Sequence, residues 1–398
     1  MGLIPMTSAF VIRHSPSAIR LWIETAHQSL PRAGEEVCGE AVRTFQTEEC
    51  FYAILASSPQ GGTEGAARAA ATAGGALEML QAGGAPDGVA ETLISIRNSL
   101  FVIRNSTDVT FSILQVLGGD QAHLVECETM PLCLIRGGEV AFLPLNEEVV
   151  RGRLLRECRF RLQDGDYMVM VSQGYLRPRG WGWGWGDIAV AVRRWTDTGC
   201  DAGELMGALM RTYRRLNPEA PRQDVTVVAM HARPVRTATV WTGPPADPAQ
   251  DEVALRKLMA EPGTRVICGD TTAQIAARLL GGDLELEPRP EDGWAEVPPV
   301  SRLEGVDLVT EGLVTLGKAR ERMVEAKRVR DLPRRGDGAT RLARALLAAD
   351  RIHCIVGLAV NPAQAADAAR TVPLRRAVVE GLVHDLRARG RLVSVEYL

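Results

Sequence analysis

Residues 162–175, Leu-Gln-Asp-Gly-Asp-Tyr-Met-Val-Met-Val-Ser-Gln-Gly-Tyr, pass from a polar turn through an apolar strand into a Ser-X-Gly turn. Position X of that turn is Gln173. Divalent metal ions such as Mg²⁺ prefer charged oxygen ligands, and a neutral amide supplies no charge. The stretch therefore predicts a strand that ends in a tight turn, and a turn that is poorly suited to hold a metal ion.

Short apolar or alternating runs surround this stretch on both sides. Turns such as Gly118-Gly119-Asp120 separate them, as in β-hairpins. Helical periodicity marks only residues 63–82, 87–100 and 202–216. Consecutive strands with few long helices indicate antiparallel sheets that are covered by helices. The expected strands are residues 10–13, 51–56, 110–117, 123–128, 132–136, 167–172 and 225–230.

The Ser172-Gln173-Gly174 turn resembles a metal-binding turn of the type 2C (PPM) protein phosphatases, in their bacterial SpoIIE-like branch, where the middle residue is aspartate. The resemblance extends over residues 8–235 and includes the strand around Phe111 and the Gly/Trp run 180–186 before Asp187. It implies an α-β-β-α sandwich of two antiparallel sheets flanked by helices. It also implies a Ser/Thr phosphatase in which carboxylates hold two Mn²⁺ or Mg²⁺ ions.

The positions that hold metal in this family are degenerate here. Glu40, in Cys38-Gly39-Glu40, stands where the family has aspartate, and its carboxylate lies about 1.5 Å further from the backbone. Ser58 and Gln173 replace two further aspartates. In the Asp-Asp pair near the domain's end, Gln223 replaces the first acid and Asp224 remains. Pro59, where the family has glycine, removes an N–H group and backbone freedom.

These replacements favour a pseudophosphatase without the two-metal centre, so no catalytic residue and no cofactor are expected. The alternative is an active Mn- or Mg-dependent phosphatase with a rearranged site. The candidate ligands of that site are Glu40, Asp108, Asp187 and Asp224. The pseudophosphatase hypothesis predicts a regulatory role, with a kinase or a phosphoprotein as the binding partner.

Composition limits the other classes of function. The chain has 398 residues, enough for two domains, and a formal net charge of −3, which argues against nucleic-acid binding. No apolar run approaches the length of a membrane span, and no signal peptide is recognisable. The eight cysteines form no C-x-x-C pair, so we expect reduced thiols in a cytoplasmic protein and no zinc site. The Gly/Trp run 180–186 is either a loop folded over the sandwich or a partner surface.

In the second half of the chain, the predicted strands and helices follow a different order. Strands at 264–268, 306–310, 352–360 and 392–397 alternate with helices at 273–280, 313–327, 339–349 and 374–389. Such alternation predicts a smaller α/β domain with a mostly parallel sheet. We therefore divide the chain into a phosphatase-like domain (residues 1–237), a Pro/Gly-rich linker (238–250) and a C-terminal α/β domain (251–398). The C-terminal half also resembles a tail that some bacterial SpoIIE-like phosphatases carry.

A ligand pocket is expected in the C-terminal domain, where polar residues follow strands. Backbone N–H groups at a helix start bind anions, and ligands of open α/β sheets lie beyond the carboxyl ends of the strands. Helix capping alone is the other interpretation of this pattern. If the domain is an enzyme that acts on a small molecule or nucleotide, Glu311 is the candidate acid or base. The candidate pocket residues are Gly269, Asp270, Thr271, Thr272, Glu311 and Asn361.

Overall fold

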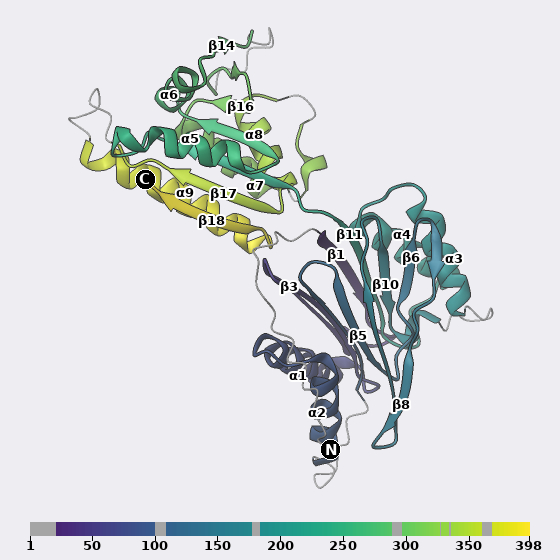
Figure 1. Cartoon of the computed structure of the whole chain (residues 1–398). Coiled ribbons are helices and arrows are strands. Elements are labelled where there is room, and N and C mark those ends of the chain that lie inside the picture. Colours follow the sequence, from purple (N-terminus) through teal and green to yellow (C-terminus); the bar gives the residue numbers. More distant parts are fainter. Residues whose placement is uncertain are drawn as a thin grey trace, which may run out of the picture. The chain divides into compact units, whose positions relative to one another are not determined.

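The computed structural model describes residues 21–99, 109–176, 184–288, 297–326, 328–333, 336–359 and 368–398. It divides into two compact units, Met1–Pro234 and Val235–Leu398 (Figure 1). Each unit has sheets and hydrophobic cores of its own. Among the described residues, no helix is both long enough and apolar enough to span a membrane.

The first unit is built on two antiparallel sheets. One has the strand order β1-β11-β10-β6-β7 and the other has the order β2-β3-β4-β5-β9-β8. The strands of the first sheet are β1 (Leu21–Leu30), β6 (Cys133–Arg136), β7 (Glu139–Ala141), β10 (Tyr167–Val171) and β11 (Val225–Pro234). Those of the second are β2 (Glu40–Gln46), β3 (Cys50–Ser57), β4 (Thr110–Leu117), β5 (Gln121–Cys127), β8 (Asn146–Val150) and β9 (Arg153–Arg161).

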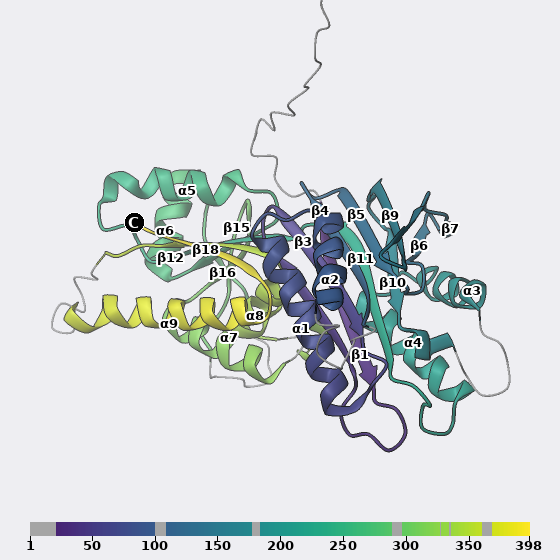
Figure 2. The ribbon, with the colours of Figure 1, turned by 90° about the horizontal axis from the view of Figure 1, so that it is seen from below.

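Two pairs of helices cover the outer faces of these sheets. The pair α1 (Gly62–Gln81) and α2 (Pro86–Ser99) lies on the second sheet, whereas α3 (Trp185–Thr196) and α4 (Ala202–Leu216) lie on the first. Figure 2 shows the strands between the two helix pairs. The α-β-β-α sandwich that the sequence predicts is therefore present. Helices expected at 63–82, 87–100 and 202–216 are confirmed to within one residue at each end.

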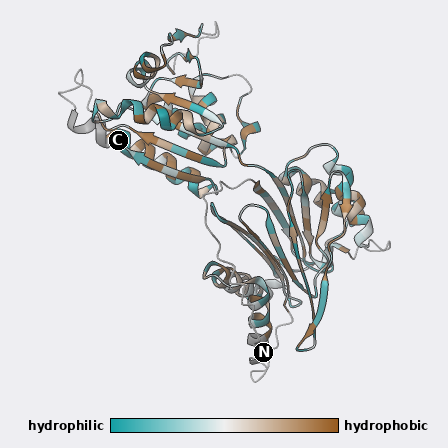
Figure 3. Ribbon diagram, viewed as in Figure 1, coloured by the Kyte–Doolittle hydropathy of each residue, from teal (hydrophilic) through white to brown (hydrophobic). Residues whose placement is uncertain are grey.

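Alternation along the strands explains the layers. On β3, Phe51, Ala53 and Leu55 enter the core between the sheets, while Tyr52 and Ile54 face the alanine-rich side of α1. The same period of two divides β10 between the inter-sheet core and the α3–α4 side. Strands of this kind are apolar on both faces, as the brown ribbons of Figure 3 show.

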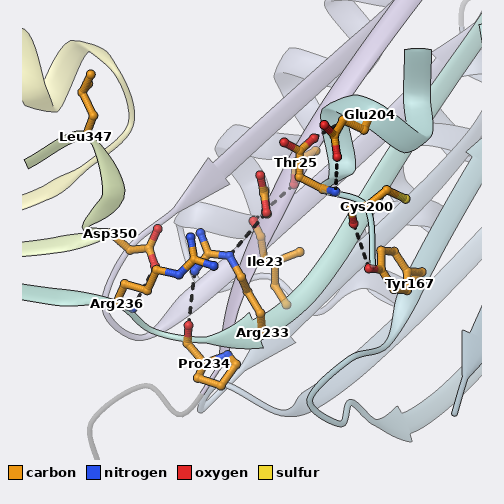
Figure 4. A network of polar contacts seen from close by, with 12 residues as sticks. Ile23, Thr25, Tyr167, Cys200, Glu204, Arg233, Pro234, Arg236, Leu347 and Asp350 are labelled. Carbon is orange, nitrogen blue, oxygen red and sulfur yellow. Dashed lines mark hydrogen bonds and ion pairs between the residues drawn. The ribbon is translucent and has the colours of Figure 1, made fainter. Parts of the chain in front are cut away.

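Polar contacts fix the strands to neighbouring elements. The Tyr167 hydroxyl donates to the backbone carbonyl oxygen of Cys200 (2.8 Å), which ties β10 to the segment before α4 (Figure 4). Arg233 on β11 pairs with Glu24 on β1 at 3.3 Å. In the second unit, the backbone N–H of Arg236 donates to the buried carboxylate of Asp350 (2.9 Å).

The second unit is a three-layer α/β domain. Its sheet has the order β14-β15-β16-β13-β12-β17-β18, and the last five of these strands are parallel. The mostly parallel sheet predicted from the sequence is therefore confirmed. The strands are β12 (Thr237–Thr242), β13 (Thr264–Cys268), β14 (Glu285–Leu286), β15 (Ser301–Leu303), β16 (Val306–Thr310), β17 (Arg351–Val356) and β18 (Leu392–Tyr397).

Helices cover both faces of this sheet, as Figure 2 also shows. On one face lie α5 (Asp251–Ala260) and α6 (Asp270–Leu280). On the other lie α7 (Leu313–Glu325), α8 (Gly338–Ala348) and α9 (Ala368–Ala388). The short turns η3 (Pro248–Gln250) and η4 (Val329–Asp331) precede α5 and α8.

The linker expected over residues 238–250 is wrong in its first part. Residues up to Thr242 form β12, which pairs with β13 and β17 in the middle of the sheet. Trp241 on this strand is fully buried, and Val240 is buried on the opposite face. The prolines and glycine that suggest a linker follow the strand as a loop. The unit boundary therefore lies at Pro234, before β12 rather than after it.

The thiols are as the sequence predicts. None of the eight cysteines, all of which lie in the described residues, forms a disulfide bond, and six of them are buried. Burial raises the pKa of Cys133, Cys268 and Cys354 to about 12. These side chains therefore act as small apolar residues of the cores.

Candidate functional site

Four sequence segments converge at one end of the sandwich. Glu40, the first residue of β2, pairs in register with Ser57, the last residue of β3. Ser29 on β1 pairs with Thr226 on β11. The Ser172 hydroxyl, directly after β10, accepts the N–H of Thr226 at 2.9 Å. The segments around Glu40, Ser58, Ser172 and Asp224 therefore lie together.

Glycines allow this close approach. A β-carbon on Gly39 would lie 2.5 Å from the α-carbon of Gly61 and 2.9 Å from Asp224 Oδ2. One on Gly174 would overlap the backbone carbonyl oxygen of Asp224. Glycine is therefore needed in the Ser-Gln-Gly turn because the backbone at the start of β11 fills the space of a side chain.

Glu40 is buried among hydroxyl groups. Ser57 Oγ donates to its Oε1 at 2.7 Å, while its Oε2 is buried without a hydrogen-bond partner among the described residues. Burial raises the pKa of the Glu40 carboxyl, and the nearby Asp224 charge acts in the same direction. The hydroxyls of Thr226, Ser57 and Ser172 only partly oppose this shift. Glu40 therefore favours the neutral acid more than an exposed glutamate does.

Asp224 is the other buried carboxylate, and it has a cationic partner. The backbone N–H of Arg32 donates to Asp224 Oδ1 at 3.0 Å, and Arg32 Nη2 lies 3.3 Å from Oδ2. The same Nη2 donates to the carbonyl oxygen of Pro59 at 2.9 Å. The guanidinium lies where a side chain on Gly61 would be. One arginine thus joins the start of β11 to the turn that precedes α1.

Glu35 lies on the same β1–β2 connection as Arg32. A β-carbon on Gly62, the first residue of α1, would lie 2.6 Å from Glu35 Oε2. A carboxylate is favourable near a helix N-terminus. The β1–β2 connection therefore brings a cation to Asp224 and an anion to the start of α1.

The three neutral replacements bond to their surroundings or face solvent. Ser58 is buried, and its hydroxyl donates to Gln60 Oε1 at 2.8 Å. Gln173 is exposed in the turn η2 (Gln173–Leu176), and its amide donates to the carbonyl oxygen of Glu128 at 3.1 Å. Gln223 is exposed beside the buried Asp224. The two glutamines are thus directed to solvent or to backbone, and Ser58 is bonded within its own turn.

The donors around Glu40 do not match the carboxylate-rich centre that the resemblance implies. Within the described parts of the chain, no three His, Cys, Asp or Glu side chains are grouped so as to hold a metal ion. The buried acids at this end are Glu40, whose raised pKa favours the neutral form, and Asp224, which a guanidinium already neutralises. Asp187 caps α3 by accepting the N–H of Gly184 at 2.9 Å. Asp108 lies outside the described residues.

Sequence reasoning did not find Arg32. It is 192 positions from Asp224, in a loop without a motif, so only the closed sandwich brings the two together. Cys38, two residues before Glu40, lies at the same end of the sandwich. Burial, followed by the charges of Glu40 and Asp224, raises its pKa to about 12, so it is not a reactive thiol.

The Gly/Trp run 180–186 is described only from Gly184 onward. The indole N–H of Trp185 donates to the carbonyl oxygen of Pro131 at 3.0 Å, and its ring lies 5.9 Å from that of Phe142. For this one tryptophan, the contacts agree with a side chain that fills a gap at the sandwich surface. Trp181 and Trp183 lie outside the described residues.

In the second unit, the candidate pocket residues follow neighbouring strands. The strands β13 and β16 are adjacent; Gly269 and then Asp270 follow β13, and Glu311 comes directly after β16. Glu311 Oε2 accepts from the backbone N–H and the hydroxyl of Thr315, at 3.4 and 3.5 Å, and so lies at the first turn of α7. Asp270 and Thr271 are exposed, whereas Thr272 is buried. Asn361 lies outside the described residues.

No protein-family model matches this chain, and no curated protein matches it in sequence. Solved structures do. The phosphatase domain of SpoIIE from Bacillus subtilis is 17% identical with a TM-score of 0.42, and the match covers 54% of this chain and 94% of that one. The RsbU and RsbW domains of a Mycobacterium tuberculosis protein are 14% identical with a TM-score of 0.46, and the match covers 61% of this chain and 68% of that one. The SiaA PP2C domain of Pseudomonas aeruginosa is 18% identical with a TM-score of 0.42, and the match covers 52% of this chain and 85% of that one.

At these identities and TM-scores, the matches assign neither an activity nor a substrate to this chain. The architecture rests instead on the sheet orders, the two helix layers and the converging motifs of the first unit. The chain is thus similar in structure to SpoIIE and other type 2C phosphatase domains, and its first unit has the α-β-β-α sandwich that the sequence resemblance implies.

Proposed function

We propose that the first unit is a pseudophosphatase: a type 2C phosphatase fold that lacks the two-metal centre and binds a phosphorylated protein or its kinase without hydrolysis. The observation that carries this proposal is the pairing of Arg32 with Asp224. In this arrangement the positive charge beside Asp224 is the guanidinium of Arg32, which takes the place that a metal ion would have.

Electrostatics supports the proposal. A pair of divalent ions carries a charge of +4 and needs several anionic ligands close by. The Asp224 side chain is only 3% exposed and already accepts two hydrogen bonds from Arg32. A metal ion at Asp224 would therefore have to displace a guanidinium. The raised pKa of Glu40 further reduces the negative charge that is available.

The same arginine supports a role in binding. The Arg32 side chain is 26% exposed, so part of its guanidinium reaches solvent beside the turn Ser58-Pro59. A guanidinium binds phosphate through paired, charge-assisted hydrogen bonds. A phosphoserine or phosphothreonine side chain is thus a chemically suitable partner for the outer side of Arg32. Without a metal-activated water, the phosphate would stay intact.

Calorimetric titration of the full chain with Mn²⁺ tests the absence of a metal centre. We expect no saturable binding up to millimolar Mn²⁺ and no Mn²⁺-dependent hydrolysis of p-nitrophenyl phosphate. A variant that combines Arg32→Met, Ser58→Asp and Gln173→Asp restores carboxylates and removes the competing cation, and it should bind Mn²⁺ measurably. Micromolar binding of two ions to the unaltered chain, with turnover, would establish the alternative of an active phosphatase with a rearranged site.

A second measurement tests binding of a phosphorylated partner. Fluorescence anisotropy compares degenerate phosphoserine and phosphothreonine peptide libraries with their unphosphorylated counterparts, in the presence of a metal chelator. The proposal expects preference for the phosphorylated libraries, and loss of that preference in Arg32→Met. Arg43→Met is the matched control, because Arg43 is exposed on β2 and its guanidinium donates to the neighbouring carbonyl of Val42. Equal binding of both kinds of library would contradict the proposal.

A further inference from the structure

The parallel sheet of the second unit reverses its strand order at one point. The chain forms β12 first, continues outward through β13 and β16, and then returns to form β17 and β18 on the other side of β12. The reversal lies between β12 and β17. In open parallel sheets, ligands bind beyond the carboxyl ends of the strands at such a point.

Glycines follow the strand ends at this edge. Gly243 comes directly after β12, Gly269 after β13 and Gly357 after β17. A β-carbon on Gly243 would lie 2.8 Å from the carbonyl oxygen of Gly357, and one on Gly269 would lie 4.0 Å from the Gly243 nitrogen. At this edge the sheet therefore presents backbone rather than side chains.

A guanidinium lies at the same point. Arg375 on α9 donates to the carbonyl oxygens of Gly357 (2.7 Å) and Ala359 (3.4 Å), and its Nη1 lies 2.5 Å from the position of a Gly243 β-carbon. Within the described residues, no carboxylate pairs with it. Burial lowers the pKa of Arg375, because removing the charged guanidinium from water is unfavourable. Two carbonyl groups use only part of the five N–H donors of a guanidinium.

The start of α6 provides a second donor group. Its N-cap is Gly269, and no side chain caps the first turn. The first N–H groups of a helix have no partner within the helix. Thr272 in this turn is 1% exposed, its hydroxyl lacks a partner among the described residues, and Oγ1 lies 3.1 Å from the position of a Gly269 β-carbon. The hydroxyl is therefore directed at the open helix start.

The neighbouring helix starts differ from α6. At α7, Glu311 already supplies an anion to the first turn. At α5, three acids (Asp247, Asp251 and Glu252) lie in or just before the first turn, whereas the first turn of α6 has one, Asp270, so negative charge repels an anion more strongly at α5. The loop after β12, Gly243-Pro244-Pro245-Ala246, also lacks the further glycines of a dinucleotide-binding turn. An anion is thus favoured at α6 and Arg375 rather than at α5 or α7.

From these observations we infer that the carboxyl edge of this sheet, around Gly243, is a binding site for a nucleoside monophosphate. Arg375, the Thr272 hydroxyl and the open N–H groups of α6 hold the phosphate. The exposed Asp270, the first residue of α6, accepts hydrogen bonds from the ribose hydroxyls, as an acid near this position does in related doubly wound sheets. Glu311 takes no part, because its carboxylate already caps α7.

Calorimetric titration of the full chain with AMP, GMP, CMP and UMP tests this site, with the four nucleosides and inorganic phosphate as further ligands. We expect at least one nucleotide to bind with a Kd below about 1 mM (an affinity of the order of 4 kcal/mol), and its nucleoside to bind at least tenfold more weakly. Binding of inorganic phosphate alone, with no gain from the nucleoside, would reduce the site to a simple anion site and overturn the nucleotide assignment.

Matched variants locate the binding. Arg375→Gln should weaken it at least tenfold and Thr272→Val about threefold to tenfold. Arg376→Gln should leave it unchanged, because the Arg376 guanidinium pairs with Glu380. Thr272→Val keeps the side-chain volume, so it tests the site even if Arg375→Gln fails to fold. The inference is wrong if no nucleotide binds, or if Thr272→Val binds as the unaltered chain does.

Discussion

Replacement of Arg32 by methionine tests whether its guanidinium stabilises the buried Asp224. Methionine keeps an unbranched stem over Gly61 but removes the 3.3 Å ion pair and the 2.9 Å hydrogen bond to the Pro59 carbonyl oxygen. Breaking a buried ion pair on one side costs about 3–5 kcal/mol. Water reaches the 26% exposed Arg32 side chain, and the Arg32 backbone N–H still donates to Asp224. We therefore expect a loss of about 2 kcal/mol in the free energy of unfolding of the first unit.

Hydrogen exchange resolved by peptide suits this measurement, because it reports β1 and β11 separately from the second unit. A loss of about 2 kcal/mol corresponds to about 30-fold faster exchange of the most protected amides. Arg43→Met, on the exposed face of β2, should change the free energy by less than about 0.5 kcal/mol. A double-mutant cycle with Asp224→Asn should give a coupling energy of about 1 kcal/mol or more. Unchanged protection in Arg32→Met, or zero coupling, would refute the assignment of Arg32 as the counter-ion of Asp224.

Two further predictions concern buried groups of the first unit. Burial raises the pKa of Glu126 from 4.5 to about 7, against the opposing charge of Arg156. Its contribution to stability is therefore fully present below pH 4.5 and is lost as the pH rises to about 7, a decline of up to about 3 kcal/mol. Hydrogen exchange at pH 5 and pH 8 should show this decline in the unaltered chain and little of it in Glu126→Gln. Gly174→Ala should destabilise the first unit by about 3 kcal/mol in urea unfolding, because its β-carbon overlaps the Asp224 carbonyl oxygen, whereas Gly75→Ala in α1, with open space around it, should be neutral or stabilising. Equal effects of the two glycine substitutions would contradict the close approach.

The elements of both units were largely predictable from local sequence. The apolar run Tyr167–Val171 and the alanine-rich periodicity of α1 specify their own secondary structure, because burial pattern and period act over a few residues. The converging motifs were also predictable, since each carries a glycine or serine turn at a strand end. The strand β12 was not, because the prolines that follow it obscured a short apolar run whose role depends on two distant partners.

Local sequence patterns specify the two layered architectures and place the neutral side chains of Ser58 and Gln173 in turns at strand ends. The cation that pairs with Asp224 follows only from the folded chain, because Arg32 meets Asp224 across 192 residues. The same holds for Arg375 beside Gly243, because the pairing of β17 with β12 brings these two distant segments to one end of the sheet. An ion pair between two loops forms only when the folded chain brings the loops together. Neither the periodicity nor the local spacing of residues in the sequence predicts it.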